Sequence, residues 1–239
     1  MFYFLIPTLM SYNFFLIAAA VIPALFLMLR AYRSDKLEKE SGAVLWSLTK
    51  AGVFSSLIAL VEERVLCFVL DRTVSKESFL YNIILYFGIV AFAEESSKYL
   101  MLRRRSWRSR EFNCQYDGVI YAVFVSLGFA LWENISYVMT YGAGTAIVRA
   151  VTAIPGHACF GVFMGVFYGF AKRFERSGDS SLSRFCRWLA VIIPALLHGA
   201  YDYIATSQTG NLYFIGFVTA LFVVSYVLVG KMSKKDDYI

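Results

Sequence analysis

Long apolar stretches make up most of this chain, and short polar connections separate them. Each stretch has about 20 residues or more, enough for a helix to cross a hydrocarbon layer of roughly 30 Å. The second is the most polar, because Lys50 and the run Glu62-Glu63-Arg64 interrupt it. The pattern predicts an all-α fold, a polytopic membrane helix bundle that forms a single integral membrane domain over residues 1–239. About seven spans are expected, at residues 3–29, 43–70, 79–102, 116–140, 147–171, 187–206 and 211–230.

The overall composition supports a membrane protein. Of the 239 residues, 59% are hydrophobic and 17% are charged, which is more apolar surface than the core of a soluble domain of this length needs. No charge precedes Arg30, whereas a secretory signal peptide begins with a basic region, so the first stretch is expected to be a retained span. The four cysteines are scattered without a CxxC pair, which indicates neither a zinc knuckle nor a disulfide framework.

The lysines and arginines of the connections lie almost entirely on one side of the predicted bundle. An external N-terminus puts 17 of them in the cytoplasmic segments and 2, Arg72 and Lys76, in the external loops. Because positive residues favour the cytoplasmic side, we expect the N-terminus outside and the C-terminus inside. The same basic blocks account for the net charge of +6. The expected partner is therefore the lipid bilayer, and nucleic acid is not expected.

The third stretch carries two carboxylates and an ammonium where lipid should exclude charge. Glu94 and Lys98 are four residues apart, and Glu95 and Lys98 are three apart, so one ammonium can pair with either carboxylate on a helix. At low dielectric, two adjacent carboxylates can take different roles: one is held as a paired ion, and the other is free to act as an acid or base. Ionisable groups at membrane depth indicate a functional site, and the alternative is a buried ion cluster that fixes helix packing.

The next two stretches also contain inward-facing polar residues. Glu133 lies four residues after Phe129 and beside Asn134, which suits either a ligand pair or an interhelical hydrogen bond. His157 lies on the same face as a stripe of glycines, so it should point at a neighbouring helix. Pro155 and Gly156 just before it can open the helix. The glycines of the stripe are Gly161, Gly165 and Gly169.

The sixth stretch pairs the second of the chain's only two histidines with a carboxylate. His198 and Asp202 are four residues apart, so the carboxylate can orient one ring nitrogen and leave the other for substrate, water or metal.

Two other charged features are interpreted as structural. Glu62, Glu63 and Arg64 form a local salt-bridged or interfacial patch, and Arg149 is close enough to the external boundary to snorkel.

Taken in order, the polar motifs resemble the PrsW family of bacterial membrane proteases, over about residues 80–205. The resemblance implies an intramembrane endopeptidase of the bacterial cytoplasmic membrane that acts on a membrane-anchored protein, with site-one cleavage of an anti-sigma factor as the family's role. It also implies that Glu94 is the general base, that Glu95 is its partner, and that histidines from other helices hold the water or the oxyanion. Lys98 and Glu133 stand where the related prenyl-protein endopeptidases have arginine and histidine. The motifs are Glu94-Glu95-x-x-Lys98, Phe129-x-x-x-Glu133-Asn134, His157 and His198-x-x-x-Asp202.

Two questions stay open at the level of sequence. A Zn²⁺ site needs about three protein ligands, and His157 and His198 with Glu133 or Asp202 would supply them, but metal-free glutamate chemistry fits the motifs equally well. The alternative functions are a proton- or ion-coupled transporter or channel that uses a buried Glu/His relay, and a non-catalytic membrane scaffold whose basic loops bind lipid.

Overall fold

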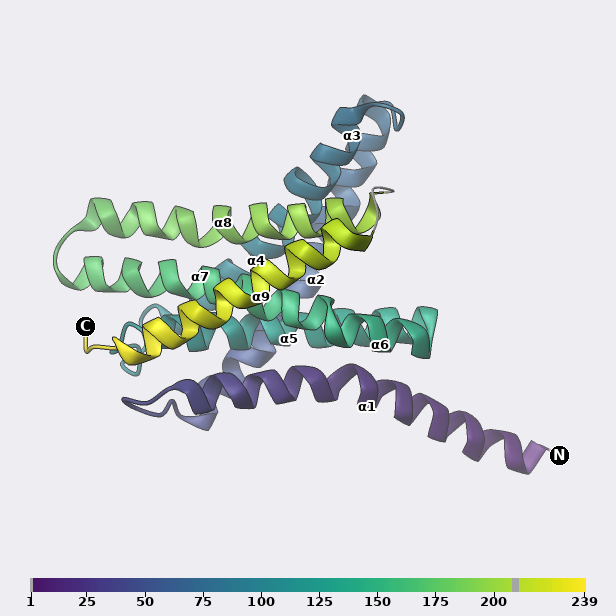
Figure 1. Cartoon of the computed structure of the whole chain (residues 1–239), viewed down its shortest axis with the longest axis horizontal. Coiled ribbons are helices and arrows are strands. Elements are labelled where there is room, and N and C mark those ends of the chain that lie inside the picture. The colour runs from purple at the N-terminus through teal and green to yellow at the C-terminus, as the bar shows by residue number, and fades with distance from the viewer. Residues whose placement is uncertain (1, 208–210) are drawn as a thin grey trace.

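The structure, a computed structural model, describes residues 2–207 and 211–239, with side chains from residue 14 onward. It is helical throughout, and no strand occurs in these two ranges (Figure 1). The predicted all-α membrane bundle is therefore confirmed. The helices are α1 Phe2–Ser34, α2 Gly42–Thr73, α3 Phe79–Ile83, the π-helix η1 Ile84–Val90, α4 Ala91–Ser106, α5 Asp117–Tyr141, α6 Ala143–Val151, α7 Ala153–Arg176, α8 Ser180–Thr206 and α9 Asn211–Lys234.

Six helical runs in the described ranges are long and apolar enough to cross a membrane. They correspond to the predicted spans except for the second. That one, α2, has 32 residues and sufficient length, but it carries Lys50 and the run Glu62-Glu63-Arg64. The most polar of the seven expected spans is thus the one that does not meet the hydropathy of a simple transmembrane helix.

The ends of the bundle match the distribution of basic residues. Figure 1 shows the α1–α2 connection, the α7–α8 connection and the C-terminus at one end, with the N-terminus at the other. The basic connections expected in the cytoplasm are therefore gathered on one side of the molecule. The N-out, C-in orientation stays a prediction that this arrangement supports.

Helix α5 lies at the centre of the bundle, and every residue from Asp117 to Ala130 is buried. Its neighbours approach closely because glycine lies at the crossings. A Cβ atom added at Gly165 of α7 would lie 2.4 Å from Val119 Cα, and one added at Gly52 of α2 would lie 2.0 Å from Val125 O. The close backbone approach predicted from the glycine stripe is confirmed.

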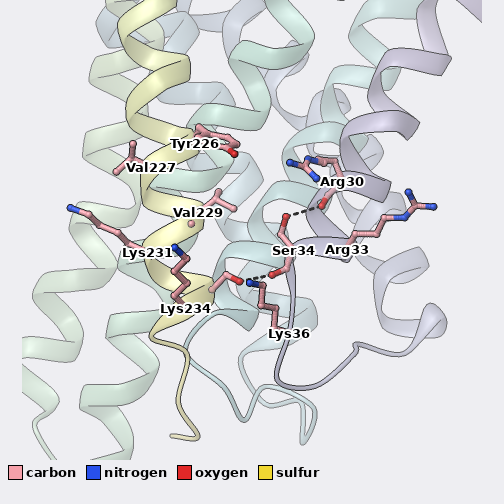
Figure 2. Close-up of a pocket in the computed structure, with 11 residues that line it drawn as sticks. Arg30, Arg33, Ser34, Lys36, Tyr226, Val227, Val229, Lys231 and Lys234 are labelled. Carbon is pink, nitrogen blue, oxygen red and sulfur yellow. Dashed lines mark hydrogen bonds between the residues drawn. The ribbon is translucent and has the colours of Figure 1, made fainter.

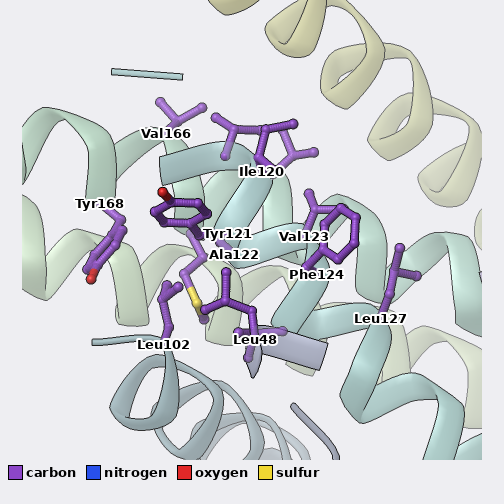
Figure 3. Packing of buried hydrophobic residues seen from close by; sticks show 14 of the residues in the cluster. Leu48, Leu102, Ile120, Tyr121, Ala122, Val123, Phe124, Leu127, Val166 and Tyr168 are labelled. Carbon is purple, nitrogen blue, oxygen red and sulfur yellow. The ribbon is translucent and has the colours of Figure 1, made fainter. Parts of the chain in front are cut away.

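Apolar side chains fill one half of the bundle. Figure 3 shows Leu48 of α2 and Leu102 of α4 against Tyr121 of α5 and Tyr168 of α7. Phe112 stacks on Tyr168, with ring centroids 5.2 Å apart. This core holds α2, α4, α5 and α7 together next to the polar residues. It therefore fixes where the polar side chains of these helices meet.

Two helical runs are interrupted near the polar residues. The run from Phe79 to Ser106 passes through the π-helix η1 directly before Glu94 and Glu95. The run Ala143–Arg176 breaks at Thr152, with φ −121° and ψ −69°. We predicted an opening at Pro155, but the break lies three residues earlier because proline is tolerated in the first turn of a helix, where its missing N–H costs no hydrogen bond.

Candidate active site

Lys98 is the centre of a buried ion cluster on α4. Its Nζ donates to Glu94 Oε2 at 3.0 Å and to Glu95 Oε1 at 2.8 Å. The side chains of Lys98 and Glu95 have no exposed surface, and that of Glu94 is 8% exposed. Lys98 also lies 3.8 Å from the centroid of the Phe129 ring. The helical spacing therefore brings the three charged groups together as predicted, and Phe129 supplies a face for the cation.

His157 of α7 links this cluster to Glu133 of α5. Its Nδ1 lies 3.2 Å from Lys98 Nζ, and its Nε2 lies 2.8 Å from Glu133 Oε2. An ammonium has no acceptor, so Nδ1 must accept and Nε2–H must donate to the carboxylate. The glycine face of α7 does point its histidine at a neighbouring helix, and the structure brings Glu133 and His157 together.

His198 of α8 closes the other side of the cluster. Its Nδ1 lies 3.0 Å from Glu95 Oε1 and 3.8 Å from Glu94 Oε2. Its Nε2 lies 3.5 Å from Asp202 Oδ2, the partner predicted from the four-residue spacing. The two histidine rings are 5.3 Å apart, centroid to centroid. His198 and Glu95, which are 103 positions apart in the sequence, thus meet in one cluster.

A cavity of about 480 Å³ gives access to this cluster. Glu94 and His198 line it, together with Glu133 and Asp202. Glu95 and His157 do not, and they lie behind these residues. Of the two adjacent carboxylates, Glu94 is thus the one that can meet water or a substrate in the cavity.

The cavity lies toward the side of the bundle that is expected to be external. Its walls include Ser136 and Tyr137 near the end of α5 and Thr206 at the end of α8. These ends are opposite the basic connections. Arg149 of α6 also lines the cavity, beside Tyr137.

Two residues interpreted as structural belong to the site instead. Arg149 does not snorkel to the boundary; its Nη2 pairs with Glu133 Oε2 at 2.8 Å, and its Nε donates to Asn134 Oδ1 at 2.9 Å. Glu63 lines the cavity, and the ion pairs of the described residues include none between it and Glu62 or Arg64. The salt-bridged patch is therefore wrong for Glu63. The positions of Arg149 and Glu63 at the cavity were not predicted from the sequence, because neither of these two residues is part of a motif.

Asn134 has a supporting role. It is fully buried, and its Nδ2 donates to Ala20 O of α1 at 3.0 Å. Because its Oδ1 accepts from Arg149, it ties α1 to α5 and fixes the arginine that pairs with Glu133. It does not line the cavity, so it positions groups at the site without facing the cavity itself.

Four residues of the cluster could hold a metal ion. Glu94, Glu95, His157 and His198 each offer one ligand atom, and these atoms lie within 4.8 Å of one another. Glu133 and Asp202 were the expected third ligands, but they lie against the outer nitrogens of the two histidines. Carboxylates in that position orient ligating histidines in many metal sites.

The fold and the site define a class, a polytopic membrane protein with a buried carboxylate–histidine cluster at a cavity between its helices. Residues 40–229 match the sequence profile described as "PrsW family intramembrane metalloprotease". The chain belongs to this family, and it is an intramembrane protease of a bacterial membrane.

Relatives in several bacteria support the same conclusion. The chain is 32% identical to Protease PrsW of Oceanobacillus iheyensis over 191 residues, 79% of this chain and 82% of the relative. It is 31% identical to Protease PrsW of Bacillus subtilis over 203 residues, 84% and 88% of the two chains. It is 32% identical to Protease PrsW of Halalkalibacterium halodurans over 222 residues, 92% and 96% of the two chains. No solved structure matches the chain significantly.

Proposed function

We propose that this protease hydrolyses a peptide bond of a membrane-tethered protein with water activated by Glu94. The observation that carries the proposal is the position of Glu94. Its carboxylate lines the cavity while it is held by Lys98 and faces His198, 3.8 Å from its Nδ1. A carboxylate base within reach of water and next to imidazole and ammonium groups is the arrangement that amide hydrolysis needs.

The proposed reaction uses groups that face the cavity. Glu94 takes a proton from a cavity water, and the water oxygen attacks the carbonyl carbon. The C–N bond then breaks, and Glu94 returns the proton to the leaving amine. Arg149 and His198 line the same cavity, and their N–H groups can stabilise the negative charge that develops on the carbonyl oxygen.

Glu95 has a different role in this proposal. It is fully buried, and it binds Lys98 at 2.8 Å and His198 at 3.0 Å without reaching the cavity. It therefore positions these two groups around Glu94. The sequence-based roles of Glu94 as base and Glu95 as its partner agree with this difference in access.

The donor set at the cluster also suits a divalent metal such as Zn²⁺. The buried oxygen Glu95 Oε2 has no hydrogen-bond partner, and carboxylate oxygens and histidine nitrogens are common zinc ligands. Glu94, Glu95, His157 and His198 would hold the ion, which when bound supplies a more acidic water. Lys98 lies within 3.2 Å of three of these residues, so its ammonium competes for the same carboxylates.

Elemental analysis of purified protein tests the metal directly. We expect about one Zn²⁺ per chain in the wild type and a clear loss in a His157→Ala, His198→Ala double variant, because two of the candidate ligands are removed. Equal metal content in the two proteins would contradict these ligands, whatever their activity.

We propose an anti-sigma factor as the substrate class, on the basis of family membership and of the cavity's position toward the external side. The experiment is cleavage of a membrane-tethered anti-sigma factor, reconstituted with the protease in vesicles. Glu94→Gln and His198→Ala should lower cleavage by at least about 100-fold, as expected for removal of a base or of an electrostatic partner.

Glu62→Gln is the matched control, since Glu62 lies next to Glu63 on α2 but does not line the cavity. Its cleavage rate should equal that of the wild type. Equal cleavage by the two site variants would contradict the role of the site. If solute or proton flux were then lost in the same variants, the transporter alternative would replace the proposal.

A further inference from the structure

A second cavity of about 480 Å³ lies at the end of the bundle that carries the basic connections. It is formed between the last turns of α1 and α9, as Figure 2 shows. It shares no residue with the cavity at Glu94, so it is a separate feature. Its lining residues are Arg30, Arg33, Ser34, Lys36, Tyr226, Val227, Val229, Gly230, Lys231, Ser233 and Lys234.

The charge of this cavity is entirely positive. Five of its lining residues are lysine or arginine, and no aspartate or glutamate lines it. The ion pairs in the described part of the chain leave all five without a carboxylate partner. In Figure 2, Arg30 extends from α1 toward α9. Cations that converge without a counter-ion favour an anionic ligand.

An apolar crevice of about 280 Å³ adjoins the basic cavity. The two share Arg30, Ser34, Tyr226 and Val229, so they form one continuous feature. Away from the shared residues, the crevice is lined mostly by small and aliphatic side chains of α1, α5, α7 and α9, among them Leu27, Val119 and Val162. The feature is thus basic at the membrane surface and apolar at membrane depth.

The helices that form this feature are open to lipid. Of the apolar spans, α1 and α9 have the smallest buried shares, 22% and 17%. A hydrogen bond from Ser233 Oγ to Ser34 O, 2.5 Å long, links their ends. Lipids of the surrounding leaflet would therefore contact both helices directly.

We propose that this cavity binds an anionic phospholipid of the cytoplasmic leaflet. The phosphate headgroup lies among Arg30, Lys36 and Lys234, and an acyl chain occupies the crevice beside Val229. Basic pockets between transmembrane helices on the cytoplasmic side suit phosphate headgroups, and this leaflet carries the negative lipid charge. A zwitterionic lipid would leave the cations unneutralised, so the site should select for net negative charge.

Lipid retention measured by native mass spectrometry tests the proposal without reference to proteolysis. Purified protein is exchanged into micelles that contain equal amounts of phosphatidylglycerol and phosphatidylcholine with the same acyl chains. The wild type should retain phosphatidylglycerol in preference. The triple variant Arg30→Gln, Lys36→Gln, Lys234→Gln should lose this retention by on the order of tenfold or more, because each cation near an anionic surface contributes about 1 kcal/mol.

The matched control removes the same charge elsewhere on the cytoplasmic side. Arg105, Arg110 and Arg184 are exposed, and they line neither of the two cavities nor the crevice. The triple variant of these residues to Gln should retain phosphatidylglycerol like the wild type. An equal loss in both triple variants would overturn the site in favour of general surface charge.

A further arm separates a lipid from a soluble anion. Val229→Phe narrows the junction of cavity and crevice, so it should lower phosphatidylglycerol retention and leave inorganic phosphate binding unchanged. If inorganic phosphate at millimolar concentration displaces the lipid fully and Val229→Phe has no effect, the site binds soluble anions and the proposal is wrong. If the triple variant does not fold, Arg30→Gln alone is compared with Arg105→Gln, and equal retention overturns the proposal.

Discussion

At the scale of single residues, the site depends on one lysine shared between two carboxylates. Lys98 donates to Glu94, Glu95 and His157 and has no exposed surface. Without it, two adjacent carboxylates would face each other at low dielectric. Lys98 therefore lets both acids remain buried, whatever part it takes in the chemistry.

Replacing this lysine should destabilise the protein strongly. Lys98→Met removes the charge and keeps the length, and we expect a loss of about 3–5 kcal/mol, the usual cost of breaking a buried ion pair by removing one partner. Thermal unfolding of purified protein in detergent measures it. Lys76→Met is the control, since Lys76 pairs with Asp71 on the surface and should cost little. Equal stability of the two variants would contradict the proposed role of Lys98.

At the scale of helices, glycine contacts set the distance between α5 and α7. These contacts hold α7 at the depth where His157 meets Glu133. A side chain at Gly165 would collide with the backbone of α5, whereas Gly144 of α6 has open space around its Cβ position. The two glycines therefore give a matched pair for a test.

Gly165→Val should separate α5 from α7, and Gly144→Ala should not. Because the added atoms meet backbone that cannot move away, we expect a loss of about 1–3 kcal/mol or more for Gly165→Val. The unfolding midpoint in detergent checks this, and cleavage should fall as His157 moves from Glu133. A Gly165→Val protein as stable as the Gly144→Ala control would show that the helices do not pack as described.

Much of the fold and the site could be predicted because short-range rules place the residues. The spacing of three and four residues on a helix gave the Glu94–Glu95–Lys98 group and the His198–Asp202 pair. The position of Arg149 could not be predicted in this way. Its contact with Glu133 depends on how the short helix α6, between Gly142 and the break at Thr152, packs against α5, and the spacing of residues along the sequence does not show this packing.

The candidate metal ligands show the same limit. Spacing indicates which residues share a helix face, but not which nitrogen of a histidine points to the centre of the bundle. Both Nδ1 atoms face the α4 cluster, and both Nε2 atoms face Glu133 or Asp202. Tertiary packing thus places Glu133 and Asp202 on the Nε2 side of the two histidines and the Glu94–Glu95–Lys98 group on their Nδ1 side.

At the scale of the whole molecule, a polar network ties the connections together at the basic end. Tyr121 of α5 donates to Glu40 Oε2 at 2.6 Å, which anchors the α1–α2 connection. Burial raises the pKa of Glu40 to about 7, with Asp117 and Glu111 nearby. The protonated form of Glu40 is therefore favoured by folding.

This raised pKa predicts how stability depends on pH. The contribution of Glu40 is fully present below its unfolded pKa of about 4.5 and is lost as the pH rises through about 7. Stability should therefore fall by roughly 1–3 kcal/mol between pH 5 and pH 8, and Glu40→Gln should make this dependence shallower. Unfolding midpoints across this range test it, with the exposed Glu77→Gln as control. The same slope in both variants would contradict the assignment.

The pairing of Lys98 with both acids within one turn of α4 also bears on how the chain is inserted into the membrane. The other partners of the acids come from His157 and His198, which are synthesised about 60 to 100 residues later. Until α7 and α8 are synthesised, the charged side chains of α4 have no partners on these helices, and the membrane favours apolar segments. Because Lys98 lies on the same helix, α4 reaches this stage with one of its two negative charges already neutralised, and the late arrival of α7 and α8 then completes the site.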